Sequence, residues 1–99
     1  MLVATVLALA LLAAACSDDD SVDTGSLGLI TDGTLTVCTD SPYPPMEYEE
    51  DGEFTGFDIE LMRAIAEDLG LEAAIVNIGF DPITSGLAMD SGECDIAAA

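Results

Sequence analysis

The sequence has no histidine, no tryptophan and a single basic residue, Arg63, against 20 acidic side chains. Its 99 residues therefore carry a formal net charge of −19 at pH 7. A surface rich in carboxylates repels phosphates, and one arginine releases few counterions, so the composition argues against nucleic acid as a partner. Without histidine, the chain cannot form imidazole zinc sites, Ser-His-Asp triads or Cys-His nucleophile pairs.

The N-terminal segment carries none of this charge, and residues 1–15 are apolar except for Thr5. The run is shorter than the roughly 20 apolar residues that cross a bilayer, so it suits the core of a secretory signal. Leu12–Cys16 resembles the lipobox of bacterial lipoproteins, with Ala13 where leucine is usual. We therefore predict a lipoprotein signal peptide over residues 1–15 and lipidation of Cys16, which would tether the chain to a membrane. An ordinary signal followed by a cysteine is the alternative.

The next segment is polar, because residues 17–33 are rich in Ser, Asp and Gly. We predict an acidic flexible tether over residues 16–33 and a folded domain over residues 34–99. The acidic run Asp18–Asp20 lacks the alternating spacing and the closing glutamate of a calcium loop, so we predict no metal site. Residues 34–99, 66 in all, are at or below the size at which one core gives comfortable stability without disulfides or partners, so we expect the folded segment to be incomplete.

The folded segment opens with a strand and a hairpin. Leu35–Thr39 is apolar and β-branched, and the prolines within residues 40–46 end this strand in a rigid loop. Asp51 and Gly52 both tolerate positive φ, which predicts a hairpin turn between two short strands.

The rest of the chain alternates helix and strand signals. Apolar residues at helical spacing predict a helix over residues 58–69, with Asp58 as its N-cap. There follow a strand within residues 71–78, a short helix over residues 82–89 that contains Gly86 and is capped by Asp81, and a strand over residues 94–99. This order predicts an α/β fold of βαβ units with a mostly parallel sheet plus a β-hairpin. Ligands of such sheets lie beyond the carboxyl ends of the strands, where residues 40–46 begin.

The same segments resemble family 3 of the bacterial extracellular solute-binding proteins, the amino-acid receptors of ABC importers. The resemblance covers about residues 33–99, with Met46 where the family usually has phenylalanine. It is carried by Gly33–Glu47 (GTLTVCTDSPYPPME), Gly56–Leu61 (GFDIEL), Ala64–Gly70 (AIAEDLG), Gly79–Asp81 (GFD) and Gly92–Ile96 (GECDI).

The resemblance implies a partial first lobe of a type II periplasmic-binding-protein-like clamp. It also implies the substrate-binding component of an importer for amino acids or similar small polar solutes, which is not an enzyme and needs no cofactor. The expected partners are an amino-acid-like ligand, an ABC permease and the membrane that holds the lipid anchor. The expected location is extracytoplasmic, in the periplasm or on the outer face of the cell membrane.

By position in the family, Asp40, Tyr43 and Phe80 would bind the ligand. Aromatic rings can stack on its carbon chain or cation, and Asp40 can accept hydrogen bonds from its polar end. Structural roles remain open, with Asp40 as a turn cap, Tyr43 as a stiffener of the proline loop and Phe80 as core. The family's arginine for the ligand carboxylate lies about a dozen residues beyond Asp95, and Arg63 inside the helix is no substitute.

Two further groups of residues have open or structural interpretations. The acidic cluster that begins at Glu47 and runs to Glu53 is predicted to be a solvated hairpin. Cys38 and Cys94 are candidates for a disulfide in an oxidising compartment. They are expected near opposite ends of neighbouring strands, where their Cα separation could exceed the ~7 Å limit, so the pairing stays open.

Two alternative functions remain on the same fold. Relatives of the clamp act as cyclohexadienyl or prephenate-type dehydratases, in which cleft carboxylates do acid or base work. Others serve as sensor domains. Because the anchoring loop and the second lobe are not in this sequence, we expect the 99-residue chain alone to bind no amino acid measurably by calorimetry, and micromolar binding would refute this.

Overall fold

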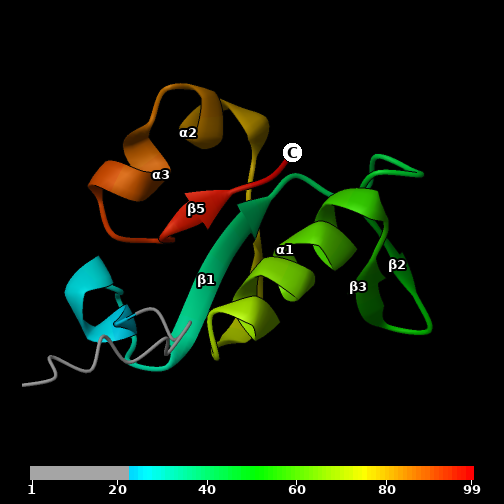
Figure 1. Cartoon of the computed structure of the whole chain (residues 1–99). Coiled ribbons are helices and arrows are strands. Elements are labelled where there is room, and N and C mark those ends of the chain that lie inside the picture. Colours follow the sequence, from blue (N-terminus) through cyan, green and yellow to red (C-terminus); the bar gives the residue numbers. More distant parts are fainter. Residues whose placement is uncertain (1–22) are drawn as a thin grey trace, which may run out of the picture.

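A computed structural model of the chain describes residues 23–99 (Figure 1). The described part contains a parallel sheet, a separate hairpin and helices on both faces of the sheet. Its elements are η1 (Thr24–Leu27), β1 (Thr34–Thr39), β2 (Tyr48–Glu50), β3 (Glu53–Thr55), α1 (Phe57–Asp68), β4 (Glu72–Asn77), α2 (Phe80–Thr84), α3 (Leu87–Asp90) and β5 (Ile96–Ala97).

The sheet has the order β4-β1-β5, and both pairings are parallel. β1 pairs with β4 along its whole length, from Thr34 opposite Glu72 to Thr39 opposite Asn77. β2 and β3 form an antiparallel pair of their own. The predicted α/β fold with a mostly parallel sheet and a hairpin is therefore confirmed.

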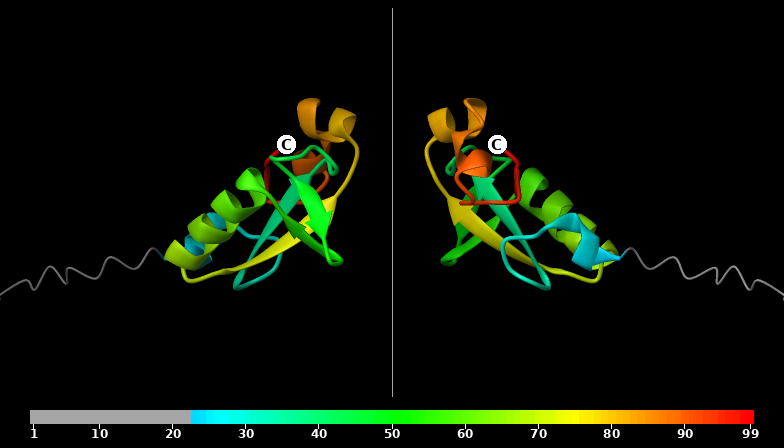
Figure 2. Two further views of the ribbon diagram at one scale, coloured as in Figure 1. Left: turned by 90° about the vertical axis from the view of Figure 1, so that its right-hand side faces the viewer. Right: turned by 90° about the vertical axis from the view of Figure 1, so that its left-hand side faces the viewer.

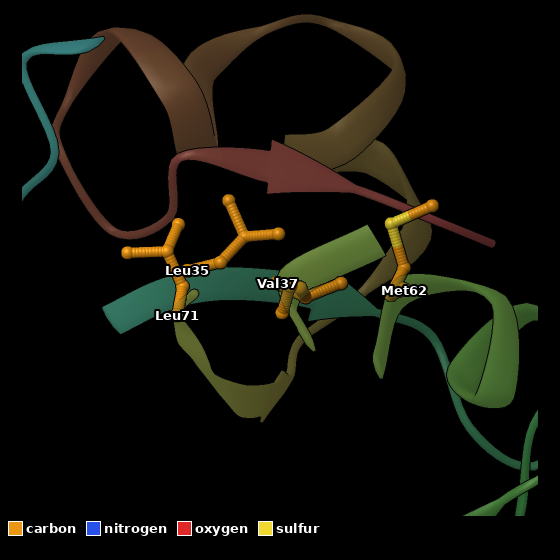
Figure 3. Close-up of a cluster of buried hydrophobic side chains, with 5 residues drawn as sticks. Leu35, Val37, Met62 and Leu71 are labelled. Carbon is orange, nitrogen blue, oxygen red and sulfur yellow. The ribbon is translucent and has the colours of Figure 1, made fainter. Parts of the chain in front are cut away.

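Alternation along β1 sends its side chains into two cores. Leu35 and Val37 point to the face covered by α1, where they pack with Met62 and Leu71 (Figure 3). Full burial of each such side chain is worth about 1.5–3 kcal/mol. Cys38 points to the opposite face, which α2 and α3 cover (Figure 2). The strand that leads into the site is thus held from both sides.

The second core contains a disulfide between Cys38 and Cys94, with a Cα separation of 5.7 Å. This distance lies within the usual range for a bridge. Cys94 does not occupy the strand position expected for it, because β5 begins only at Ile96. Cys94 lies instead in the connection from α3, where the Asp95 amide donates to the Thr36 carbonyl at 2.9 Å. This hydrogen bond holds the connection beside β1 and brings Cys94 within bridging distance of Cys38.

The hairpin and the first helix fall where the sequence predicts them, but the helix caps do not. Gly56, at φ +112°, is the N-cap of α1 and takes the place predicted for Asp58. The predicted helix over residues 82–89 is two helices, because Gly86 at φ +79° breaks the helical path. α2 begins at Phe80 after Gly79, so Asp81 lies inside the helix instead of capping it.

The described part of the predicted tether, residues 23–33, contains η1, and Leu29 packs against the first core. The Asp95 carboxylate accepts hydrogen bonds from the Ile30 amide at 3.0 Å and the Thr36 amide at 2.9 Å. Part of the segment that was predicted to be a flexible tether therefore packs on the folded domain. The predicted signal peptide, Cys16 and the start of the tether lie outside the described residues. Within residues 23–99, no helix is long and apolar enough to cross a membrane.

Candidate functional site

A cavity of about 340 Å³ opens at the carboxyl end of the sheet. It is built from the loop after β1, the first residue of α2 and the chain after β5, whose end lies beside that loop in Figure 1. The lining residues are Asp40, Pro42, Tyr43, Glu47, Phe80 and Ala99. The structure therefore brings the three predicted ligand-binding residues to one cavity, at the edge that the βαβ topology predicts. That they bind a ligand stays a prediction.

The two aromatic rings of this cavity are exposed. Tyr43 is 63% exposed and Phe80 is 52% exposed, so neither ring is covered by the described core. Exposed rings at a cavity offer flat apolar faces for stacking, and their electron-rich faces attract cations. Their exposure is a feature of a binding surface more than of a packed interior.

The loop that carries Asp40 is fastened to the neighbouring strand. The Ser41 amide donates to Asn77 Oδ1 at 2.9 Å, and Asn77 Nδ2 donates to the Ser41 carbonyl at 3.3 Å. Asn77 is the last residue of β4, so this reciprocal pair joins the ends of two parallel strands. Asp40 therefore leaves the sheet from a fixed point.

The far end of the loop is fastened to α1. The Phe57 amide donates to the Pro45 carbonyl at 3.0 Å, and the Asp58 amide donates to the Met46 carbonyl at 2.9 Å. These backbone carbonyls satisfy the first free amides of the helix, a role usually taken by a side-chain cap. The close approach places residues 45–47 directly over the helix N-terminus.

Glu47 is the residue of this cavity that sequence reasoning missed. Its side chain is only 1% exposed, so its interpretation as part of a solvated acidic hairpin is wrong, although Glu49, Glu50 and Glu53 are exposed as expected. Its carboxyl oxygen Oε2 is buried and has no hydrogen-bond partner among the described residues. The one available signal was its place directly after the proline loop instead of near the turn.

The pKa of Glu47 is raised from its ordinary value of 4.5 to about 7, chiefly by burial and, to a smaller extent, by the neighbouring carboxyl groups of Asp58 and Asp40. Glu47 is therefore held near the midpoint of its titration at neutral pH.

The raised pKa predicts that the stability of the fold depends on pH. Between the ordinary pKa of 4.5 and about 7, the folded chain holds a proton that the unfolded chain releases. The contribution of this proton to the free energy of unfolding is fully present below about pH 4.5 and is lost as the pH rises through about 7. In urea denaturation, the free energy of unfolding of the native chain should fall across this pH range by on the order of 2–3 kcal/mol more than that of Glu47→Gln.

Glu49→Gln removes the same charge from the exposed face of the hairpin and is the control for this measurement. It should keep the native pH dependence. Equal slopes for Glu47→Gln and the native chain would contradict the assignment of this titration to Glu47.

The lone base of the chain is not part of this cavity. Arg63 Nη1 lies 2.7 Å from Glu60 Oε1, and the two residues form an ion pair between successive turns of α1. In the part of the chain that the structure describes, no three His, Cys, Asp or Glu side chains are grouped so that they could hold a metal ion. The chemistry of the cavity is therefore that of carboxylates, aromatic rings and backbone groups.

The sequence model of the bacterial extracellular solute-binding proteins, family 3, matches residues 35–99. The chain is 34% identical over 93 residues to the L-cystine-binding protein TcyJ of Escherichia coli, covering 92% of this chain and 34% of that protein. It is 30% identical over 63 residues to a cyclohexadienyl dehydratase of Pseudomonas aeruginosa, covering 63% of this chain and 24% of the enzyme.

Two solved structures show the same fold. The L-cystine solute receptor of Neisseria gonorrhoeae, in its unliganded open conformation, matches with a TM-score of 0.60 and 36% identity over 67% of this chain and 28% of the receptor. Domain 1 from TmArgBP, in its arginine-bound form, matches with a TM-score of 0.59 and 33% identity over 68% of this chain and 54% of that domain. The chain spans about a third of the length of the curated binding protein it matches.

Proposed function

The chain belongs to family 3 of the bacterial extracellular solute-binding proteins, and we propose that it acts in the substrate-binding component of an ABC importer for amino acids or similar small polar solutes. The observation that carries this proposal is the cavity that gathers Asp40, Tyr43 and Phe80 at the carboxyl end of the parallel sheet. A small polar solute needs such a set, with rings for its carbon chain and an acceptor for its polar end.

In the proposed receptor, Tyr43 and Phe80 stack against the ligand and Asp40 accepts from its donors. A second lobe closes over the ligand, and the closed clamp docks on the permease. The arginine-bound domain 1 from TmArgBP supports part of this picture, because there a single domain of the fold is found with its ligand. Contact with one lobe alone is expected to be weak, since an open cavity leaves part of the ligand in water.

We further propose that the protein is extracytoplasmic and held to the membrane by a lipid on Cys16. The apolar run of residues 1–15 and the lipobox-like segment before Cys16 support this. Family members are extracytoplasmic, which agrees with a secretion signal.

A dehydratase is the second candidate function. It is favoured by Glu47, because a carboxyl group with a pKa of about 7 in a cavity suits general acid or base work. The likeness to the cyclohexadienyl dehydratase spans 63% of this chain, against 92% for the cystine-binding protein, so we favour the receptor. Turnover of a prephenate-like acid that Glu47→Gln abolishes would reverse this preference.

The receptor function can be tested by NMR titration of the chain with each of the twenty amino acids at millimolar concentration. We expect a subset of them to shift the amide signals of the cavity loop and of Phe80. Phe80→Ala should weaken this binding by about tenfold or more through loss of ring contact. Phe57→Ala is the matched control, because Phe57 is also exposed, at 63% against 52% for Phe80, but lies on α1 outside the cavity lining. Absence of any amino acid that shifts the cavity signals would refute the proposal.

A further inference from the structure

A five-residue loop, Tyr43–Glu47, carries both a ring of the cavity and its buried acid. The Tyr43 amide donates to the Glu47 carbonyl, and the Glu47 amide donates back to the Tyr43 carbonyl at 3.0 Å. The Met46 amide donates to the same Tyr43 carbonyl at 2.9 Å. Because the loop is closed on itself in this way, Tyr43 and Glu47 move together when the loop moves.

The loop rests on the N-terminus of α1 through two backbone carbonyls, which accept from the amides of Phe57 and Asp58. Free amides at a helix N-terminus are donors that stabilise a nearby carboxylate. Here both donate to the loop instead, and Glu47 Oε2 is buried without a donor among the described residues. The docked loop therefore suits a neutral Glu47 and gives an ionised Glu47 little stabilisation.

The charged groups around Glu47 also disfavour its ionised form. Asp58 acts on it from the first turn of α1, and Asp40 acts on it from the loop after β1. Tyr43 and Ala99 line the same cavity but do not contribute to the raised pKa of Glu47. The lone base of the chain is held in an ion pair on α1 and does not line the cavity. An ionised Glu47 would thus be a third negative charge that no basic side chain among the described residues offsets.

We propose that the Tyr43–Glu47 loop is a pH-sensitive latch, docked on α1 while Glu47 is neutral and released from α1 when Glu47 ionises. On release, Glu47 gives its proton to water, its carboxylate becomes hydrated, and the amides of Phe57 and Asp58 are freed. The Tyr43 ring leaves its place with the loop, so pH controls the shape of this wall of the cavity. The inference goes beyond the proposed receptor function, because it concerns the loop itself and needs no ligand.

The direction of the switch follows from the pKa of Glu47 in the two positions of the loop. This pKa is about 7 in the docked loop and returns to the ordinary 4.5 where the side chain is in water. The equilibrium constant for release should therefore rise about tenfold per pH unit between pH ~4.5 and pH ~7, or roughly 300-fold in all. Below this range the proton keeps the loop docked, and above it the constant levels off.

The first test is hydrogen exchange of the Phe57 and Asp58 amides in the full chain, since the loop covers these amides only while it is docked. Their protection factors should fall about tenfold per pH unit between pH ~5 and pH ~7. Low urea should not change them, because local release exposes little surface, whereas the amides of β1 should exchange only through urea-sensitive global unfolding. Glu47→Gln should abolish the pH dependence, and Glu49→Gln, at an exposed position, should keep it.

The second test follows Tyr43 itself. The chain has two tyrosines and no tryptophan, so Tyr48→Phe leaves Tyr43 as the sole tyrosine. NMR relaxation dispersion of its ring carbons should detect a second position whose population rises up to pH ~7, and Glu47→Gln should remove this position. A Tyr43 ring with a single position up to pH ~8 would show that the wall of the cavity does not move.

A variant of α1 separates the latch from a general loss of stability. Asp58→Asn removes an acid beside Glu47 but keeps the backbone, so the loss of protection at the Phe57 amide should end at a lower pH and be smaller in total. Asp68→Asn, at the exposed far end of α1, should have no such effect. Protection that does not depend on pH, a pH dependence that survives Glu47→Gln, or exchange only through urea-sensitive unfolding would each overturn the proposal.

Discussion

Replacement of Gly56 by alanine is expected to lower the free energy of unfolding by roughly 3 kcal/mol or more, enough to leave much of a small domain unfolded. Gly56 has φ +112°, a conformation that L side chains rarely adopt. A Cβ at this position would also lie 2.7 Å from the carbonyl carbon of Met46 and 2.9 Å from the Pro45 oxygen, with Met46 O closer still. These are backbone atoms, so no side chain can move aside.

The comparison that isolates this effect is Gly52→Ala. Gly52 also has positive φ, at +81°, but a Cβ added there would meet no atom beyond its chain neighbours within 4 Å. Gly52→Ala should therefore show only the conformational cost, about 1–2 kcal/mol, in urea denaturation. If Gly56→Ala costs no more than Gly52→Ala, close packing of the loop on α1 is not what requires glycine at Gly56.

Gly56 also shows why local sequence patterns predict a helix better than its ends. The spacing of Ile59, Met62 and Ala66 is a property of the helix alone, and all three are buried as that pattern predicts. The N-cap, by contrast, depends on a loop that precedes the hairpin in the sequence and is no part of the helical pattern. Because the carbonyls of Pro45 and Met46 accept hydrogen bonds from the first amides of α1, no side-chain cap is needed.

The candidate site, like the helix, was predictable from the sequence only in part. Asp40, Tyr43 and Phe80 follow strand ends or belong to segments that resemble the family, so the sequence alone predicts that they lie together. Glu47 could not be recognised in this way, because an acid in an acidic cluster is normally solvated. Its burial comes from the close contact of the loop with α1, which is a tertiary feature without a local signature.

The disulfide is the second feature whose removal should have a large effect. Cys38 and Cys94 are 56 residues apart in sequence, and the loop they close contains the hairpin, α1, β4, α2 and α3. In the chain-entropy model, a loop of this length stabilises the fold by about 4 kcal/mol. Reduction with dithiothreitol is therefore expected to lower the free energy of unfolding by about this amount, as measured by urea denaturation.

The control for reduction is the double variant Cys38→Ala, Cys94→Ala, whose stability should be low and unaffected by dithiothreitol. Cys38 also lies directly before Thr39 and Asp40 at the end of β1, and its partner holds the connection that leads to β5 and Ala99. Loss of the bridge should thus loosen two walls of the cavity, so reduction should weaken any ligand binding together with stability. A reduced chain that unfolds at the same urea concentration as the oxidised chain would show that the two cores hold the sheet without the bridge.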